Sequence, residues 1–272
     1  SRLNNVWKFL MADYQHLLTT TENGTLHITL NRPEAKNAMS LSLLTELIDA
    51  LDKAEASDGI RVIVVRGAEG NFSAGADIKD MAAARKQDDP AAAIYELSCA
   101  FGAMVARFAT TPKTIISALE GAVMGGGFGL ACASDIAIAS HTVKFALPET
   151  TLGLIPAQIA PVLLERIGYS EAKRLTVTGA RIGADEAMRI GLVHAITDEM
   201  DEDLGDAVRH ALKCAPQAVA VSKQLLRDAR FAQSDTLVEH AANLFVDAVT
   251  GSEGAEGTAA FVEKRKAAWM PK

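Results

Sequence analysis

The feature that most constrains this chain is a run of three glycines, Gly125 to Gly127, between a strand-like segment and an apolar one. Glycine has no Cβ, so another group can approach such backbone closely. The apolar run from Phe128 to Ala133 has helical character, and a glycine turn that enters a helix points unbonded N–H groups at whatever lies above it. The sequence therefore predicts that this turn binds a ligand through its backbone.

A second segment, Ala74-Gly75-Ala76-Asp77, repeats this layout earlier in the chain. It follows a β-branched run, Ile60 to Arg66, and precedes a predicted helix from Asp77 to about Lys86. N–H donors from two separate segments can hold one oxygen as it becomes negative, which is the arrangement called an oxyanion hole. Loss of one donor from such a site typically costs ~2.7–4 kcal/mol of transition-state stabilisation.

Glu149 is the candidate acid or base. It follows the predicted strand from Val143 to Leu147 and comes shortly before Gly153. An acid on such a loop beside apolar residues is well placed to have its protonation tuned by burial. Position alone leaves open that Glu149 is a solvated loop residue. Asp77 has the similar alternative of an acidic residue at a helix N-terminus.

Composition excludes several classes of protein. The 272 residues carry a net charge of −7, with 49% hydrophobic and 22% charged residues, which is typical of a globular protein and unfavourable for binding nucleic acid. No uninterrupted apolar run approaches the ~20 residues that cross a bilayer, and the six histidines lack metal-ligand spacing. Three widely separated cysteines indicate reduced thiols in a cytoplasmic protein. We therefore expect no nucleic acid, membrane or metal partner.

The order of elements predicts an α/β core over residues 11–200 and a helical region over residues 201–272. Residues 1–10 are expected to be a leader, and Gly251 to Gly257 a flexible linker. The expected strands are 16–21, 25–30, 60–66, 113–119, 136–139, 143–147 and 192–196. The expected helices are 41–56, 77–86, 91–109, 170–178, 183–190, 203–214, 218–231, 235–250 and 253–268, with a further helix opening at 155–161. Periodicity alone fits a doubly wound sheet as well as any other α/β arrangement.

Four motifs occur in a fixed order and together resemble the crotonase (enoyl-CoA hydratase/isomerase) superfamily. They are Asn31-Arg32-Pro33 with Asn37-Ala38, Phe72 to Ile78, Met124 to Gly129, and Pro148-Glu149. The resemblance runs from about Asp13 to the C-terminus. It implies a spiral of ββα repeats with a C-terminal all-helical trimerisation region, assembled as a homotrimer or a dimer of trimers.

The resemblance also implies the site. The N–H groups of Ala76 and Gly126 would bind the carbonyl oxygen of an acyl-CoA thioester, and Glu149 would move the proton. Coenzyme A would enter as part of the substrate, with no separate cofactor. The further substrate contacts implied or proposed are Ser73, Ala74, Ile78, Met81, Met124, Gly129, Phe261 and Lys264. Arg32 stays open between a solvated loop charge and a structural or CoA-phosphate role.

Two departures from the family pattern bear on the reaction. The two-glutamate hydratases of the family carry a first glutamate 20 residues before the second, and here that place is Gly129 (149 − 129 = 20). Pro156 to Pro161 replaces the family's glycine-rich turn and is expected to change the wall near the acyl group. We expect an enoyl-CoA hydratase-like enzyme with one glutamate. A Δ3,Δ2-enoyl-CoA isomerase and a non-catalytic binding or scaffold protein are the alternatives, and Gly129→Glu should raise crotonyl-CoA hydration if the pocket has room.

Overall fold

The computed structural model describes residues 14–232 and 235–271, so the expected leader at 1–10 lies outside the described residues. Nine strands occur in this described part: β1 Leu17–Glu22, β2 Thr25–Leu30, β3 Val62–Gly67, β4 Thr114–Leu119, β5 Ala122–Met124, β6 Ile136–Ser140, β7 Lys144–Ala146, β8 Arg181–Ile182 and β9 Ala195–Thr197. The helices are α1 Leu41–Glu55, α2 Ile78–Ala84, α3 Pro90–Thr110, α4 Gly126–Ala133, α5 Ala160–Thr178, α6 Ala184–Arg189, α7 Met200–Lys213, α8 Pro216–Ala229, α9 Val238–Thr250 and α10 Ser252–Val262. Three short 3-10 turns are η1 Pro33–Ala35, η2 Ala68–Gly70 and η3 Glu149–Leu152.

The strands form two sheets. The larger has the order β1-β2-β3-β4-β6-β9, in which β1 and β2 are antiparallel and the remaining neighbours are parallel. The turn between β1 and β2 is an Asn23-Gly24 hairpin, with φ of 48° and 81°, the conformation that favours these residues. The smaller sheet has the order β5-β7-β8.

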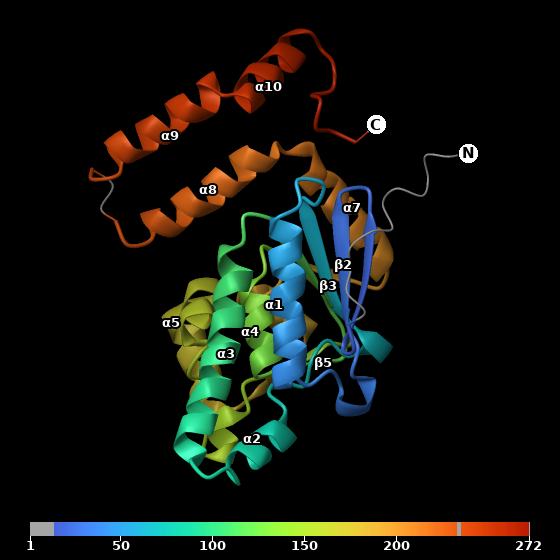
Figure 1. Ribbon diagram of the computed structural model, residues 1–272, viewed down its shortest axis with the longest axis vertical. Helices are drawn as coiled ribbons and strands as arrows, with labels where there is room; N and C mark the ends of the chain where they lie inside the picture. Colours follow the sequence, from blue (N-terminus) through green and yellow to red (C-terminus); the bar gives the residue numbers. More distant parts are fainter. Residues whose placement is uncertain (1–13, 233–234, 272) are drawn as a thin grey trace.

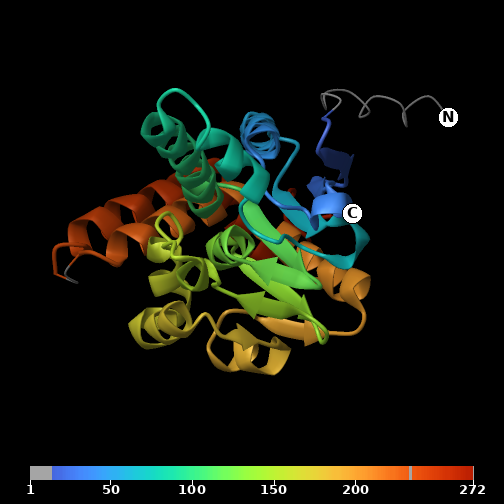
Figure 2. The same cartoon turned by 90° about the horizontal axis from the view of Figure 1, so that it is seen from below.

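The larger sheet is covered on both faces. Strand residues alternate between faces, so Ile63 and Val65 of β3 join the main core with α1, α3 and α4. Val62 and Val64 point the other way and pack with Met200 and other residues of α7. Figures 1 and 2 show the resulting layers, with α1, α3 and α4 on one side of the sheet and α7 on the other.

Two helices show why the local predictions succeed. Ser40 accepts a hydrogen bond from the N–H of Leu43 at 3.3 Å and so begins α1, whose leucines then face the core. Helix α3 is long and apolar enough to cross a membrane by length and composition alone. It packs instead along α1 and α4, and its Met104, Val105 and Phe108 are buried in the main core.

The helices α8, α9 and α10, called here the C-terminal arm, extend away from the sheet (Figure 1). Arg61, the residue before β3, ties the root of the arm to the core. Its guanidinium donates to the carbonyl oxygens of Trp269 at 2.5 Å, Leu212 at 2.8 Å and Cys214 at 2.6 Å. The arm is therefore anchored at the ends where parallel strands begin.

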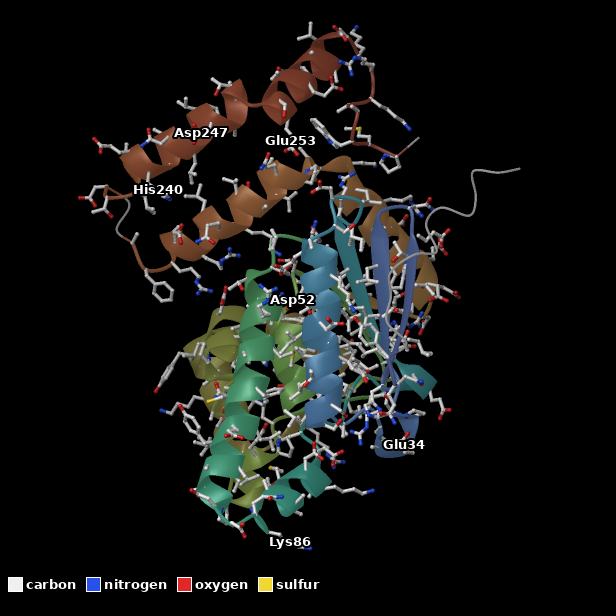
Figure 3. All side chains as sticks on the ribbon, viewed as in Figure 1. Glu34, Asp52, Lys86, His240, Asp247 and Glu253 are labelled. Atoms are coloured by element: carbon white, nitrogen blue, oxygen red, sulfur yellow. The ribbon has the colours of Figure 1, made fainter. Side chains whose placement is uncertain are left out.

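The expected linker at Gly251 to Gly257 is wrong, because α10 begins at Ser252. Glu253 caps α8 by accepting from the N–H groups of Gln217 and Ala218 at 2.9 and 3.0 Å, and its side chain lies between the two helices in Figure 3. A Cβ at Gly254 would overlap the backbone of α9. These glycines therefore permit close helix packing and do not loosen the chain.

Other predicted boundaries also move. Helix α5 runs continuously from Ala160 to Thr178 with a break in helical geometry at Gly168, where two helices were expected. Helix α10 ends at Val262, well before the predicted end at residue 268. The short strands β5 and β8 were not predicted, because two or three residues carry no periodicity.

Candidate active site

The two glycine segments are brought together by strand-like pairing. The N–H of Ser73 donates to Ala122 O, and the N–H of Met124 donates to Ser73 O, each at 2.9 Å. The first segment therefore lies alongside β5 and directly beside the turn into α4. The fit leaves no room for a side chain at Gly75, where a Cβ would lie 2.9 Å from Met124 O and 3.4 Å from the nitrogen of Gly126.

One amide of the first segment is left unused. The N–H groups of Phe72, Ser73, Ala74, Gly75 and Asp77 donate, in that order, to Glu120 O, Ala122 O, Lys36 O, Ser73 Oγ and Met39 O. The N–H of Ala76 has no acceptor among the described residues, and Ala76 is exposed. Because Ala76 is exposed and its N–H makes no bond within the described part of the chain, this donor is open to a ligand.

The second free amide belongs to Gly126, the first residue of α4. An N–H at this position has no partner within the helix, and in the described part of the chain it finds none elsewhere. The turn is set by Gly125, whose φ of 49° and ψ of −112° are accessible essentially to glycine alone. Its own N–H donates to Ala146 O at 3.0 Å, which fixes the start of α4.

Glu149 lies beside this turn. It is the first residue of η3, and its Oε1 is 2.8 Å from the position that a Cβ on Gly125 would occupy. Its Oε2 is buried and has no hydrogen-bond partner among the described residues. Burial raises the pKa of the Glu149 carboxyl, and a hydrogen bond from its own backbone N–H offsets this only in part. A half-buried acid of this kind can accept and return a proton.

The space beside Gly129 is filled. A Cβ at Gly129 would overlap Cγ2 of Ile159, a residue that is buried just before α5. The segment that departs from the family pattern therefore supplies an aliphatic side chain against the backbone where a second glutamate would begin. The pocket has no room for Gly129→Glu, so the condition on which that substitution was expected to help is not met.

Several neighbours of the site were not found by sequence reasoning. A Cβ on Gly126 would lie 2.8 Å from Cζ of Phe101 and 2.9 Å from Cε of Met39, so these side chains wall the free amide. Gln158 donates to Ser98 Oγ at 3.0 Å and joins the segment before α5 to α3. These contacts join residues far apart in the sequence, and no local pattern signals them.

Arg32 is a structural residue. Its Nη2 lies 2.8 Å from Oδ2 of Asp77, with only 15% and 6% of the two side chains exposed, so the solvated-loop alternative is wrong. Asp77 also caps α2, because its Oδ1 accepts from the N–H of Lys79 at 2.8 Å. Burial alone raises the pKa of Asp77, but hydrogen bonds from Arg32 and the backbone outweigh it and the pKa is lowered.

The other predicted contact residues are dispersed. Met81 and Met124 are half-buried, and Met124 comes two residues before the free amide of Gly126, whereas Ile78 is exposed. The hydroxyl of Ser73 is fully buried and donates to Asn37 O, and Ala74 is half-buried. Phe261 at the end of α10 and Lys264 just after it are exposed, and α10 lies on the opposite side of the molecule from α2 (Figure 1). Within one chain they are not part of this site.

No group of three or more metal-ligating side chains occurs among residues 14–232 and 235–271. The chemistry available at the site itself is therefore that of two amide donors and one carboxylate. Such a set can polarise a carbonyl and transfer a proton at the adjacent carbon.

Comparisons with known proteins place the chain in context. The family model described as enoyl-CoA hydratase/isomerase matches residues 20–272. The crystal structure of an enoyl-CoA hydratase/isomerase from Marinobacter aquaeolei is similar, with a TM-score of 0.90 and 46% identity over 93% of this chain and 98% of that one. Pseudomonas aeruginosa AtuE gives a TM-score of 0.91 and 45% identity over 94% and 100%. A probable enoyl-CoA hydratase of Rhizobium meliloti is 36% identical over 258 residues, 93% of this chain and 97% of that protein.

Proposed function

Because the chain belongs to the enoyl-CoA hydratase/isomerase family and has the crotonase fold, we propose that this enzyme adds water to the double bond of an enoyl-CoA thioester. The observation that carries the proposal is the juxtaposition of two unbonded amides, of Ala76 and Gly126, with the carboxyl of Glu149 beside Gly125. The printed names of relatives, including probable enoyl-CoA hydratases, support the same reaction class.

The proposed mechanism uses only these groups. The thioester oxygen accepts hydrogen bonds from the two amides, which stabilise the enolate that forms when water attacks C3. Glu149 takes one proton from the attacking water as its oxygen bonds to C3. It then returns that proton to C2, so the product gains one water and the enzyme is unchanged. Coenzyme A enters as part of the substrate, and no separate cofactor is required by this route.

The filled space at Gly129 supports a one-carboxylate site. Ile159 cannot orient water by hydrogen bonding, so Glu149 has to position the nucleophile as well as activate it. We therefore propose an acyl substrate that differs from the straight-chain crotonyl group. Met81 and Met124, with the newly found Phe101 and Ile159, are the proposed acyl contacts.

A Δ3,Δ2-enoyl-CoA isomerase is the second candidate, because the same observation favours it. Isomerisation needs no water: one carboxylate removes a proton from C2 and delivers it to C4, or the reverse, through the same enolate. An apolar Ile159 beside the site suits that reaction. No observation favours a scaffold without catalysis, since both free amides and the acid are present.

We further propose a homotrimer or a dimer of trimers. Helix α9 has no buried residue within one chain, and 70% of Phe245 is exposed. Three chains that share such surfaces would bury them. Phe261 and Lys264, remote from the site of their own chain, would in that assembly serve coenzyme A bound by a neighbouring copy. The cytoplasm is the proposed location, supported by three free cysteines.

The test of function is an absorbance assay over a panel of straight-chain and branched enoyl-CoA esters. Hydration removes the conjugated chromophore of a 2-enoyl-CoA, whereas isomerisation of a 3-enoyl-CoA creates it. Loss of absorbance with 2-enoyl esters, abolished in Glu149→Gln, is the expected result. Gain of absorbance with 3-enoyl esters alone would establish the isomerase. Turnover of every ester that survives Glu149→Gln would contradict both.

A further inference from the structure

A buried ion pair lies immediately behind the free amide of Ala76. Asp77, the next residue, is paired with Arg32 at 2.8 Å. Nη1 of the same guanidinium donates to the carbonyl oxygen of Ala38 at 2.6 Å. Arg32 thus bonds to Asp77 and to Ala38, which belong to the two segments that meet beside Ala76.

The backbone of Met39 holds the two residues on either side of Ala76, whose amide is free. The N–H of Met39 donates to Gly75 O at 2.8 Å, and the N–H of Asp77 donates to Met39 O at 3.2 Å. Ala76 therefore lies between two residues that are bonded to the same partner. The direction of its own N–H follows from how firmly Met39 and Asp77 are held.

Arg32 in turn holds the residues that precede Met39. The N–H of Arg32 donates to Oδ1 of Asn37 at 2.9 Å, and Asn37 has a left-handed φ of 55°. Nδ2 of Asn37 donates to Ala68 O at 3.0 Å and Asn71 O at 2.6 Å. The backbone and side chain of Arg32 together hold the segment before Met39 and the carboxylate of Asp77.

We propose that Arg32 is a positioning residue for the oxyanion: its guanidinium, bridging Asp77 and Ala38, sets the direction of the Ala76 N–H. This inference rests on the proposed function, in which that amide binds the thioester oxygen. The nearest other carboxylate, Glu34, lies 4.0 Å from Nε of Arg32, too far for a hydrogen bond. The side-chain hydrogen bonds of the guanidinium therefore go to Asp77 and Ala38.

The shape of arginine matters here as well as its charge. A planar fork reaches two acceptors in fixed directions, whereas an ammonium group acts as a point charge. Arg32→Lys would keep the charge beside Asp77 and lose the bond to Ala38. Arg32→Met would lose both and leave the buried Asp77 carboxylate without its cationic partner. Asp77→Asn would remove the ion pair and keep the volume.

The test separates positioning from folding. The probe is a cinnamoyl-CoA thioester with a para-dimethylamino group, whose absorbance moves to longer wavelength when hydrogen bonds polarise its carbonyl. We expect the wild-type enzyme to shift this band and Arg32→Met to abolish most of the shift. For an enoyl-CoA substrate, kcat should fall about 10²-fold, as misplacement by about 1 Å can cause, while KM changes less than about threefold. Arg32→Lys should be intermediate.

Arg174→Met is the matched control, since Arg174 binds two carboxylates, of Glu171 at 2.7 Å and Glu186 at 2.6 Å, on α5 and α6. It should leave the band shift and kcat unchanged. If Arg32→Met does not fold, Asp77→Asn and Arg32→Lys give the same comparison. Folded variants of the pair with the full band shift and full kcat would overturn the inference. A wild-type enzyme that binds no acyl-CoA would overturn the proposed function itself.

Discussion

Oε1 of Glu149 occupies the space directly beside Gly125, 2.8 Å from where a Cβ at that residue would stand. The carboxyl therefore contacts the residue that precedes the free amide of Gly126. The acid and the donor are set by one turn of backbone, so a change at Gly125 affects both.

Gly125→Ala should reduce both stability and activity. Its φ of 49° and ψ of −112° lie in a region that costs other residues on the order of 1–3 kcal/mol, and the new methyl would displace the Glu149 carboxyl. We expect urea denaturation to show that loss and kcat to fall about 10²-fold or more. Gly168→Ala is the control, since Gly168 lies within α5 with φ of 71° and nothing within 4 Å of where its Cβ would stand; it should lose stability alone. Equal kcat values for the two variants would contradict the contact.

Glu149→Gln should abolish most turnover and leave acyl-CoA binding intact. General acid–base catalysis typically contributes about 10²–10⁴-fold, and kcat should fall by that order. Isothermal titration with a non-reactive acyl-CoA should give a dissociation constant within a few-fold of the wild-type value. A variant that binds poorly would show that the side chain holds substrate and does not primarily transfer protons.

The pH dependence follows from the raised pKa of Glu149. The base must be ionised, so kcat/KM should fall with decreasing pH at an acid limb above the ordinary glutamate value of 4.5. For stability, a raised folded-state pKa favours the native state below the unfolded pKa, and this contribution is lost as pH rises through the folded pKa. Glu149→Gln should therefore be more stable than wild type at neutral pH, with the difference shrinking in acid. Thermal melts over a pH series measure this; a constant difference would contradict it.

Gly129 and Ile159 should be energetically coupled. Gly129→Ala forces a methyl into Ile159 and should cost about 1–3 kcal/mol, as overpacking does. Ile159→Ala removes a buried side chain and should cost about 2–5 kcal/mol. Because the second change makes room for the first, the double variant should be more stable than the sum predicts, by about 0.5–3 kcal/mol. Free energies of unfolding from urea titrations test this, and simple additivity would show that the two residues do not share the space.

Much of the core could be predicted because its signals are local. The cap at Ser40, the spaced leucines after it, and the β-branched run that becomes β3 each contain their own evidence. The two glycine segments were found for the same reason. The spiral arrangement came from resemblance, since alternation of strands and helices fits other α/β sheets equally well.

The rest depends on partners that are distant in the chain. Arg32 reads as a loop charge until the fold brings Asp77 against it. Ile159 carries no sign that it fills the space at Gly129. Gly254 lies in a segment with the composition of a linker, yet a glycine is needed there because the backbone of α9 leaves no room for a Cβ. A single sequence does not distinguish a glycine that frees the backbone from one that admits a neighbour.

Strand β3 runs between the attachment of the C-terminal arm and the loop that leads to the active site. Arg61, just before it, holds the C-terminal arm, and the loop after Gly67 leads to the amide of Ala76. The arm and the reactive groups thus lie toward opposite ends of a single short strand. Figure 3 labels Asp247 on the arm at one end of the molecule and Lys86, which follows α2, at the other. A change at Arg61 that loosens the arm therefore acts at the end of β3 that is remote from the Ala76 amide of the same chain.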